Sequence, residues 1–598
     1  MGIKLSDYVA QKVYELGVRH VFMVTGGGSM HLNHSLGTNS NLECIFNHHE
    51  QASAMAAESY YRLTNQIALV NVTSGPGGTN TITGVYGAWT DSIGMVVISG
   101  QVKYETTVRS TSLPLRQYGD QELDIEQLVK PITKYAVMVV NPNMIRYHLE
   151  KAFYLATSGR PGPCWLDIPL DIQGAEIDLD SMPKFDPSEI EQPCENSDLA
   201  NSCNSILKAI SLAERPVIYA GGGIRLSGAL DEFIKVVEKL GIPVVTGWNA
   251  HDVIWNTHKL YVGRPGTVGN RSGNFAVQNA DLLLILGNRL NIRQVGYNWK
   301  SFAQKAYKIW VDIDPTELKK PTVQPNMSVI ADLAIFLPIL LKVPFVKSGE
   351  KHQRWLAWCK NRLERYPVVL PEYWLSEKIN PYCFIESLFN KLKKDEVVVA
   401  ANGTACVVGF QAAHLKFGQR LWTNSGCASM GYDLPAAIGA SIASNKGSVI
   451  CLAGDGSIMM NLQELQTIRH YSLPIKIFIL NNSGYSSIRQ TQKNFFNGAK
   501  VGADNESGIS FPSFFKISRA FNIPYYKCTN HSSMENEIDF CIKSTGPIIC
   551  EVFLDENQQF SPKLSSKKNQ DGSIVSSDLE NMSPFLSEDE LKSNLFTG

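Results

Sequence analysis

Apolar and polar positions along this chain predict strands that alternate with helices. Short, continuous apolar runs are typical of strands buried on both faces of a parallel sheet, and segments with apolar residues at helical spacing separate them. For the first third we expect helices over 7–16, with Ser6 as the cap, and 51–62, strands over 21–24, 67–72 and 95–99, and a Gly-rich loop over 73–80. This order predicts an α/β unit.

The same alternation recurs twice more. We expect strands over 216–220, 282–286 and 308–313 in a second unit, and over 397–400, 448–452, 475–480 and 548–552 in a third. Segment 171–200 is acidic, contains Pro and lacks clear periodicity, and segment 343–374 is charged and aromatic; both are predicted to be linkers. From Phe560 onward the chain reads as a polar tail with a turn at Asp571-Gly572. The predicted fold class is α/β, with three doubly wound parallel-sheet domains.

Composition and charge narrow the function classes. The 598 residues are 44% apolar, and 55 Lys and Arg balance 56 Asp and Glu, for a formal net charge of −1. This balance argues against broad capture of nucleic acid or an anionic membrane. No apolar stretch is long enough to span a bilayer and the start lacks a signal-peptide pattern, so we expect a cytoplasmic protein. The 12 Cys form no CxxC pair and are expected to be buried thiols.

Two strand ends in the third unit carry the strongest chemical signal. Gly454-Asp455-Gly456-Ser457 follows one predicted strand, and Asn482-Ser483-Gly484-Tyr485 follows the next. Carboxyl ends of parallel strands share one edge of a sheet, so Asp455 and Asn482 can converge there. A carboxylate and an amide oxygen are hard ligands that suit Mg²⁺, and glycines let the backbone approach a phosphate closely. Each motif alone is an ordinary turn, whereas the pair at this spacing is specific.

These motifs resemble the fingerprint of thiamine diphosphate enzymes. Further segments are similar to acetolactate synthase catalytic subunits, and together they cover residues 1–555: His49-Glu50-Gln51-Ala52, Thr73 to Asn80, Ser99-Gly100-Gln101-Val102, Asp312-Ile313-Asp314-Pro315 and Ser425 to Gly439. The resemblance implies thiamine diphosphate and Mg²⁺ as cofactors, with Asp455, Asn482 and the Gly484 carbonyl holding the metal. It implies a pyrimidine-binding, a central and a diphosphate-binding domain.

The resemblance also assigns roles around the cofactor. Glu50 matches the carboxylate that hydrogen-bonds the aminopyrimidine and promotes loss of the thiazolium C2 proton. Met430 matches the bulky residue that props the cofactor in its bent shape, and the Ala428 carbonyl would accept from its amine. Without the family, Glu50 is a helix-start carboxylate and Met430 is core filling. The remaining expected cofactor contacts come from Asn402, Gly403, Thr404, Gly454, Gly456, Ser457 and Tyr485.

Five positions bear on the substrate side. Gln101 and Gln121 match active-site glutamines of the family, with loop structure as the alternative. His31 follows the Gly-rich turn at 26–28 and is a candidate proton shuttle, or else a structural histidine. The family's acceptor-selecting Trp is replaced by Thr491, and Asp120 stands where an aromatic residue is usual. Both changes suit a larger, hydroxyl-rich acceptor.

Two further expectations concern FAD binding by the central unit and the oligomeric state. Gly221-Gly222-Gly223 and Gly287-Asn288-Arg289 sit at strand ends suited to FAD, but the family's Arg-Phe-Asp-Asp-Arg run is Arg289-Leu290-Asn291-Ile292-Arg293 here. FAD binding and an empty structural domain therefore both stay open. In the family, Glu50 of one subunit faces Asp455 of another, which implies at least a homodimer.

The expected activity is carboligation by an acetolactate synthase-like lyase or transferase. Thiamine diphosphate would serve to decarboxylate a 2-ketoacid, most simply pyruvate, and to pass a two-carbon unit to an acceptor carbonyl. The resemblance extends to homologues from surface-polysaccharide clusters, which suggests a sugar nucleotide as acceptor. The alternatives are a simple decarboxylase or oxidase, and a non-catalytic cofactor-binding paralogue. The expected limits are 1–180, 195–345 and 372–556 for the three domains and 557–598 for the tail.

Overall fold

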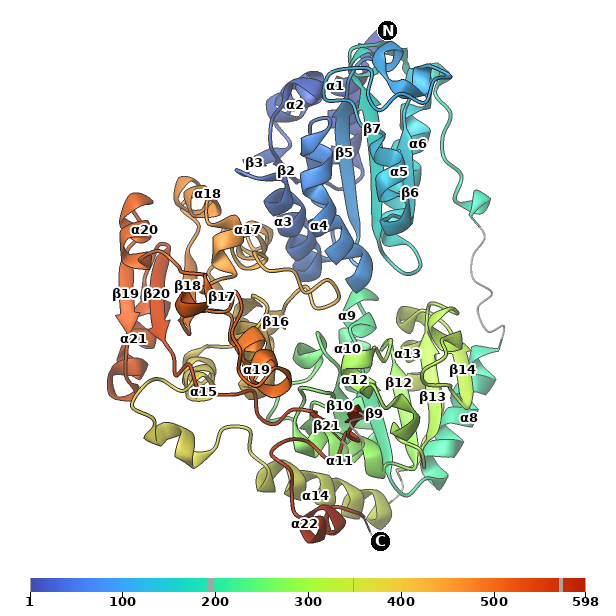
Figure 1. Cartoon of the computed structure of the whole chain (residues 1–598). Helices are drawn as coiled ribbons and strands as arrows, with labels where there is room; N and C mark the ends of the chain where they lie inside the picture. Colours follow the sequence, from blue (N-terminus) through green and yellow to red (C-terminus); the bar gives the residue numbers. More distant parts are fainter. Residues whose placement is uncertain (1, 191–197, 348, 569–573, 597–598) are drawn as a thin grey trace.

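Three α/β domains, each built on a six-stranded parallel sheet, make up the computed structural model (Figure 1). The structure describes residues 2–190, 198–347, 349–568 and 574–596. The expected turn at Asp571-Gly572 and part of the first expected linker lie outside these ranges. No helix in the described ranges combines the length and the apolar content needed to cross a membrane.

The N-terminal domain has the sheet order β3-β2-β4-β5-β7-β6. Strands β4, β5 and β7 are buried along their whole length, which explains their continuous apolar sequence. The strands are β2 (His20–Met23), β3 (Glu43–Phe46), β4 (Leu69–Val72), β5 (Met95–Gln101), β6 (Tyr135–Met138) and β7 (Pro163–Pro169). The helices are α1 (Leu5–Glu15), α2 (Met30–Thr38), α3 (Glu50–Thr64), α4 (Pro76–Asp91), α5 (Ile125–Val129), α6 (Ile145–Thr157) and α7 (Leu170–Gln173).

Two local predictions for this domain are wrong. Ser6 does not cap α1, because the helix begins one residue earlier and the Ser6 hydroxyl is buried 2.9 Å from that of Ser35. The Gly-rich segment 73–80 is largely the first turn of α4 rather than a loop. Gly75, with φ +56°, precedes that helix, and Pro76 occupies its first turn, where a missing N–H costs nothing.

The central domain has the sheet order β11-β10-β9-β12-β13-β14. Its strands are β9 (Pro216–Ala220), β10 (Val244–Thr246), β11 (Tyr261–Gly263), β12 (Leu282–Leu286), β13 (Tyr307–Asp312) and β14 (Met327–Ile330). Its helices are α8 (Leu199–Leu212), α9 (Gly223–Leu226), α10 (Leu230–Leu240), α11 (Arg271–Asn279), α12 (Ile292–Val295), α13 (Leu333–Lys342) and α14 (Gly349–Arg365). Helix α14 lies in the second expected linker, so that prediction is wrong. Its fully buried Trp355 donates to the Pro216 carbonyl at 3.1 Å.

The C-terminal domain has the sheet order β16-β15-β17-β18-β20-β19. Its strands are β15 (Val397–Ala400), β16 (Arg420–Trp422), β17 (Val449–Gly454), β18 (Ile475–Asn481), β19 (Tyr525–Cys528) and β20 (Ile548–Phe553). Its helices are α15 (Pro381–Lys391), α16 (Thr404–Ala412), α17 (Asp433–Ala443), α18 (Glu464–His470), α19 (Ser486–Phe495), α20 (Phe514–Ala520) and α21 (His531–Lys543).

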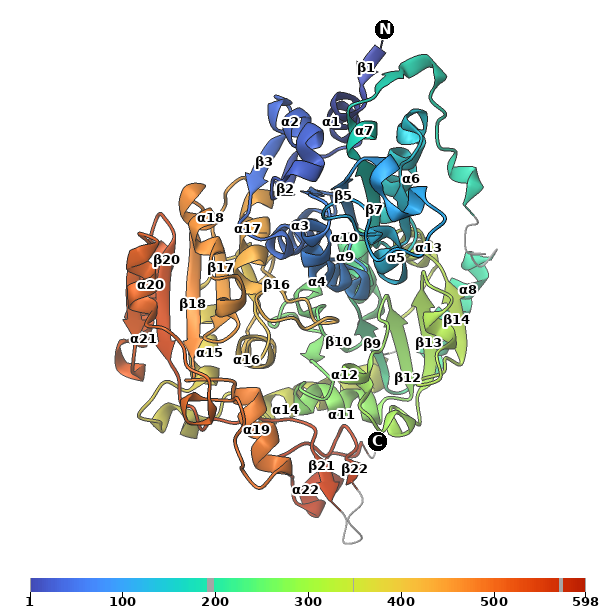
Figure 2. The same ribbon diagram turned by 45° about the horizontal axis from the view of Figure 1, so that its top comes forward.

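The chain ends are not free polar segments. At the N-terminal end, β1 (Gly2–Lys4) pairs antiparallel with β8 (Glu176–Asp178), so the first expected linker starts as part of this domain. In the described tail, β21 (Ser566–Lys568) pairs antiparallel with β22 (Ile574–Ser576), and the helix α22 (Glu588–Ser593) follows. These elements lie beside α11 and α14 of the central domain (Figure 2). The tail residues Leu579 and Met582 are buried there.

Candidate active site

The ends of β17 and β18 bring Asp455 and Asn482 together. The two strands pair in register, with Gly454 opposite Leu480, and both side chains are buried. One oxygen of Asp455, Oδ2, accepts from the backbone N–H groups of Asn482 (3.1 Å) and Gly484 (3.0 Å). The carboxylate is therefore fixed at the carboxyl edge of the sheet, where ligands of such folds bind.

Asn482 carries the clearest sign of a missing partner. Its Oδ1 is buried without a hydrogen bond from any residue that the structure describes, while its Nδ2 donates to the Thr404 hydroxyl at 3.1 Å. A buried acceptor with no partner costs free energy unless a bound group satisfies it. The described residues contain no cluster of three or more His, Cys, Asp or Glu that could hold a metal. The oxygen pair of Asp455 and Asn482 fits Mg²⁺ better than a softer ion.

Burial makes the carboxyl group of Asp455 harder to ionise. Desolvation raises the pKa of this carboxyl to about 6, against the opposing effect of the N–H groups of Gly484, Gly456 and Asn482. A divalent cation would favour the carboxylate. The guanidinium of Arg489, on the first turns of α19, donates to the Asn482 carbonyl at 2.7 Å and holds the same turn. The sequence analysis missed Arg489, although a basic residue soon after the Asn482 motif was a signal that could have found it.

The segment expected to contact phosphates opens a helix. Gly403 has φ +75° and precedes α16, and the first residue of this helix, Thr404, contacts Asn482, so the helix begins at the edge that carries Asn482. The first N–H groups of a helix are a ready anion site. Asn402 donates to the Asn424 side chain (2.9 Å) and the Ser429 carbonyl (2.7 Å) and so holds the next loop.

That loop carries Ala428 and Met430. Ala428 adopts a left-handed backbone with φ +54°, and Met430 is 38% exposed. Exposure rules out core filling for Met430 and leaves its side chain available to a ligand. The Ser457 hydroxyl accepts from the Gly431 N–H at 2.9 Å and donates to Asp433 at 2.6 Å. Ser457 thus braces this loop, and the cofactor contact expected for it stays a prediction.

The glycines of the two strand-end motifs, Gly454, Gly456 and Gly484, differ in what a side chain at each position would meet. A Cβ on Gly456 would lie 2.2 Å from the ring of Tyr485, so packing of this ring accounts for the glycine. A Cβ on Gly484, which has φ +143°, would lie 2.2 Å from the Ala503 carbonyl oxygen. Around Gly454 the nearest atom would be 3.7 Å away, which leaves its strand end open to a ligand.

Glu50 begins α3 in the N-terminal domain. Its carboxylate accepts from the Asn80 side chain at 3.0 Å, and α4 supplies Asn80. A Cβ on Gly77 would lie 3.7 Å from Glu50 Oε1, so α4 passes close to the carboxylate. Asn80 was not singled out as a site residue, although it closes the Gly-rich segment. The pair presents an oriented carboxylate at the surface of its domain.

Gln101 and Gln121 have different environments. Gln101 is buried at the end of β5, where it donates to the Leu123 carbonyl (2.8 Å) and Asp167 (3.1 Å) and accepts from the Val102 N–H (3.0 Å). Its carboxamide is thus engaged within the domain rather than turned to a substrate. Gln121 is exposed with φ +60°, and a Cβ on Gly75 would lie 2.5 Å from its carbonyl oxygen.

His31 lies beside Gly174. Burial together with the Lys4 ammonium lowers the pKa of its imidazole. Among the described residues no hydrogen bond or ion pair joins His31 with Glu50. The expected proton shuttle therefore has no link to the reacting end of the site in this chain.

A cavity of about 400 Å³ lies where the three domains meet. It opens at the carboxyl ends of β9, β12 and β13, the usual place for a dinucleotide in such a sheet. Trp248 Nε1 and Gln294 Oε1 are buried there with no hydrogen-bond partner among the described residues, so the cavity suits a polar ligand. Asn291 caps α12 by accepting from the Gln294 N–H at 3.2 Å, a task that the acidic residue of the family would also perform.

Each of the three domains matches a known protein-family domain. Residues 3–128 match the thiamine pyrophosphate enzyme N-terminal TPP binding domain, 203–340 the central domain and 401–552 the C-terminal TPP binding domain.

Curated relatives agree over nearly the whole chain. The acetolactate synthase large subunit of Buchnera aphidicola subsp. Acyrthosiphon pisum (strain APS) is 33% identical over 93% of this chain and 96% of its own length. Acetolactate synthase 2, chloroplastic, of Zea mays is 31% identical over 94% of this chain and 87% of its own. The chain belongs to the thiamine pyrophosphate enzyme family and is similar to acetolactate synthases over more than nine-tenths of its length.

Proposed function

We propose that this protein is a carboligase that decarboxylates pyruvate and joins the two-carbon unit to an acceptor carbonyl. The observation that carries the proposal is the buried, unpartnered Asn482 Oδ1 beside the fixed carboxylate of Asp455. With Mg²⁺ these residues would hold the diphosphate, and Glu50 would hold the pyrimidine ring. When bound, thiamine diphosphate supplies the carbon nucleophile and the electron sink for loss of CO₂. The family and the acetolactate synthase relatives support this reading.

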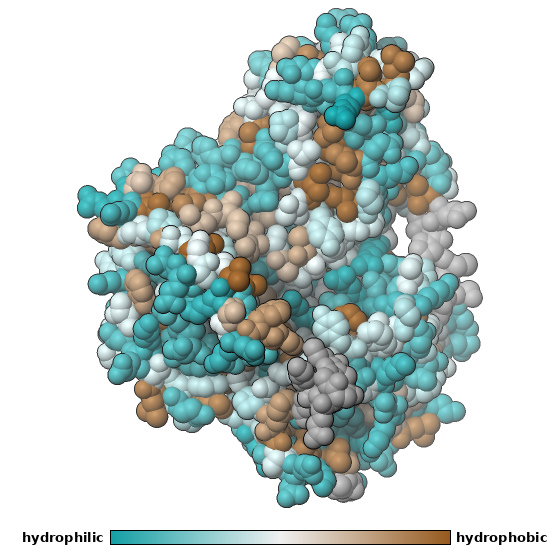
Figure 3. All heavy atoms as spheres, viewed as in Figure 1, coloured by the Kyte–Doolittle hydropathy of each residue, from teal (hydrophilic) through white to brown (hydrophobic). Residues whose placement is uncertain are grey.

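We propose that two chains share each site. Helix α4, which places Asn80 beside Glu50, exposes the aromatic side chains of Tyr86 and Trp89. Figure 3 shows apolar side chains gathered on the same lobe, which is the N-terminal domain of Figure 1. Around the Asp455 edge, Met430 and Met460 are exposed. Two exposed apolar regions, one beside each half of the site, suit a homodimer in which the halves meet across the subunits.

Three finer proposals follow from the resemblance. FAD would occupy the 400 Å³ cavity, which the unpartnered Trp248 and Gln294 support. The acceptor would be a sugar nucleotide of surface-polysaccharide synthesis, which the small Thr491 on α19 supports. The domain limits would be those expected from the sequence: 1–180, 195–345 and 372–556, with a tail from 557.

Pyruvate turnover with thiamine diphosphate and Mg²⁺ tests the activity. We expect release of CO₂ and formation of acetolactate when pyruvate is also the acceptor. Glu50→Gln should lower turnover by about 10²–10⁴-fold, the usual size of a proton-transfer contribution, while the surface variant Glu43→Gln keeps full rate. Retained activity in Glu50→Gln would contradict the role of this carboxylate.

The rival functions give different products. A simple decarboxylase yields acetaldehyde, and an oxidase yields an oxidised product, each without a new carbon–carbon bond. A non-catalytic paralogue binds thiamine diphosphate and Mg²⁺ but releases no CO₂ from pyruvate. Analysis of the products formed from pyruvate therefore distinguishes the decarboxylase, the oxidase and the non-catalytic paralogue from the proposed carboligase.

A further inference from the structure

A second cavity borders the candidate active site. It measures about 610 Å³ and lies between α12 of the central domain, α19 of the C-terminal domain and the start of the tail. Ala428 and Thr491 line it, and so does Ser487, which lies 3.9 Å from a Cβ built on Gly403. The cavity therefore opens onto the loops that would carry the cofactor, on the side where an acceptor would enter.

The charge lining this cavity is one-sided. Arg289, Arg293 and Lys563 line it, and none of the described lining residues is Asp or Glu. Lys563 makes no ion pair or side-chain hydrogen bond with any described residue, and burial lowers the pKa of its ammonium group. The guanidinium of Arg293 stacks over the ring of Trp248 at 5.1 Å and likewise has no carboxylate partner among the described residues. Within the described part of the chain, Arg289 has one ion pair, a long one of 3.7 Å with Asp91.

The tail holds Lys563 in place through a strap over residues 560–564. The Phe560 N–H donates to Gln490 of α19 at 3.3 Å, and the Pro562 carbonyl accepts from Gln411 at 2.6 Å. The Leu564 N–H donates to the Thr267 carbonyl of the central domain at 2.7 Å. Figure 1 shows this segment running between α19 and the central domain. A strap tied to both domains fixes the backbone of Lys563 at the cavity wall.

Partly buried cations without partners raise the free energy of the empty site, and an anion that binds them removes this cost. A single carboxylate, such as that of pyruvate, would offset one of the three charges. A phosphate or diphosphate carries more charge and more acceptor oxygens, and guanidinium groups recognise it by paired hydrogen bonds. The volume of the cavity also exceeds what a three-carbon acid needs.

We propose that Lys563 and Arg293, with Arg289, bind a phosphate or diphosphate group of the acceptor substrate and so select a phosphorylated carbonyl compound. The proposal rests on the carboligase function and adds the residues that recognise its acceptor. Lys563 is then a specificity-determining residue supplied by the tail, and Thr491 leaves room for the body of the acceptor.

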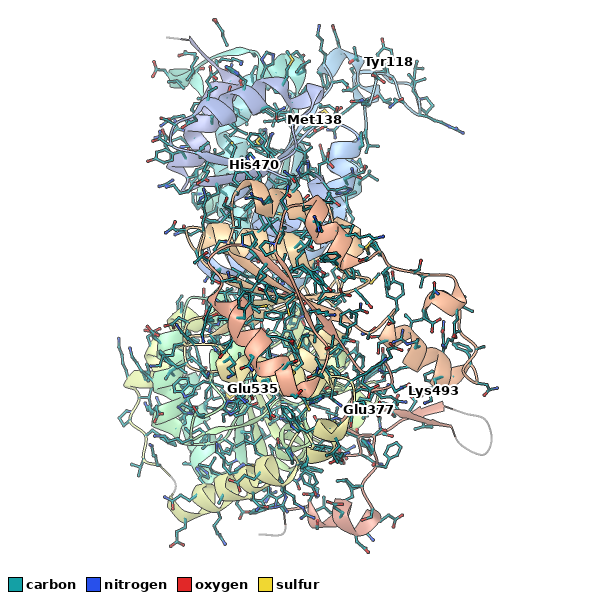
Figure 4. The ribbon with its side chains drawn as sticks, turned by 90° about the vertical axis from the view of Figure 1, so that its left-hand side faces the viewer. Tyr118, Met138, Glu377, His470, Lys493 and Glu535 are labelled. Atoms are coloured by element: carbon teal, nitrogen blue, oxygen red, sulfur yellow. The ribbon has the colours of Figure 1, made fainter. Side chains whose placement is uncertain are left out.

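Titration of UDP into protein saturated with thiamine diphosphate and Mg²⁺ tests the proposal. We expect UDP to bind, and Lys563→Met and Arg293→Met each to weaken its binding by at least about tenfold, as for a lost charge-assisted contact. Lys563→Arg should retain most of the affinity. Lys493→Met removes a lysine from the same helix as Thr491, at the outer edge of the molecule (Figure 4), and should bind UDP like the parent protein.

Two results would overturn the proposal. The first is UDP affinity that is unchanged in Lys563→Met and Arg293→Met, in protein that still binds thiamine diphosphate normally. The second is unchanged UDP binding together with a raised KM for pyruvate, which would assign the cavity to a carboxylate. Failure of the carboligase function would be separate, because the parent protein would then release no CO₂ from pyruvate whatever its affinity for UDP.

Discussion

Individual carboxyl groups in this chain differ mainly in how deeply the fold buries them, whether they belong to Asp or to Glu. Asp167 lies inside β7, and desolvation raises the pKa of its carboxyl to about 7, although Ser99 donates to it at 2.6 Å and Gln101 at 3.1 Å. Glu50, by contrast, lies at the domain surface with Asn80 as partner. Sequence alone could not separate these two acids, because the distinction depends on which strand covers which side chain.

Asp167 predicts a pH dependence of stability. Because its folded pKa lies above the ordinary value of 3.8, the folded protein binds the extra proton between about pH 4 and 7. Stability from this group is present at low pH and lost as the pH rises through about 7. Asp167→Asn removes the titration, so its Tm relative to the parent should rise between pH 5 and pH 8, as thermal unfolding would measure.

The exposed Asp231 on α10 provides the control for this experiment. Asp231→Asn should keep a constant difference in Tm from the parent over the same range, since its charge stays in solvent in both states. A flat difference for Asp167→Asn as well would contradict the assignment of a raised pKa to the buried carboxyl.

At the scale of elements, the N- and C-terminal domains are joined by close helix packing. A Cβ on Gly439 of α17 would lie 2.0 Å from the Ala56 carbonyl oxygen of α3. Nearby, the Tyr432 hydroxyl donates to the buried Glu58, which also pairs with Arg62. The short side chains let the backbones approach, and the polar network fixes their register.

Gly439→Ala should therefore destabilise the protein by about 1 to 3 kcal/mol, because the helices must separate to admit the methyl group. A matched control is Gly409→Ala in α16, where the nearest atom to the new Cβ would be 3.8 Å away. That change should be neutral or stabilise by up to about 1 kcal/mol through helix propensity. Thermal unfolding checks both, and equal effects would argue against the tight contact.

At the scale of the whole molecule, the proposed dimer predicts complementation between inactive chains. Glu50→Gln and Asp455→Asn should each abolish most of the activity when alone. A mixed dimer of the two should regain about half of the parent activity, because one of its two sites then combines an intact Glu50 with an intact Asp455. Co-expression with two different tags and a turnover assay measure this. No recovery in a purified mixed dimer would mean that both residues act from the same chain.

Much of the architecture was predictable at this scale. Strands 216–220, 282–286 and 397–400 coincide with β9, β12 and β15, because strands buried on both faces are continuous apolar runs. Helix α14 was missed because few of its residues are buried and most of its surface is charged. The tail was missed because its buried residues, such as Met582, find their partners on α11, some 300 positions away.

The sequence by itself determined the three α/β units, the family and the two strand-end motifs around Asp455 and Asn482. These follow from local periodicity and from residues adjacent along the chain. Only the tertiary structure decided that Asn482 has an unpartnered oxygen, that Gln101 is engaged inside its domain and that the tail brings Lys563 to a cavity of positive charge. Burial and partner choice depend on groups far apart along the chain, and no local pattern contains that information.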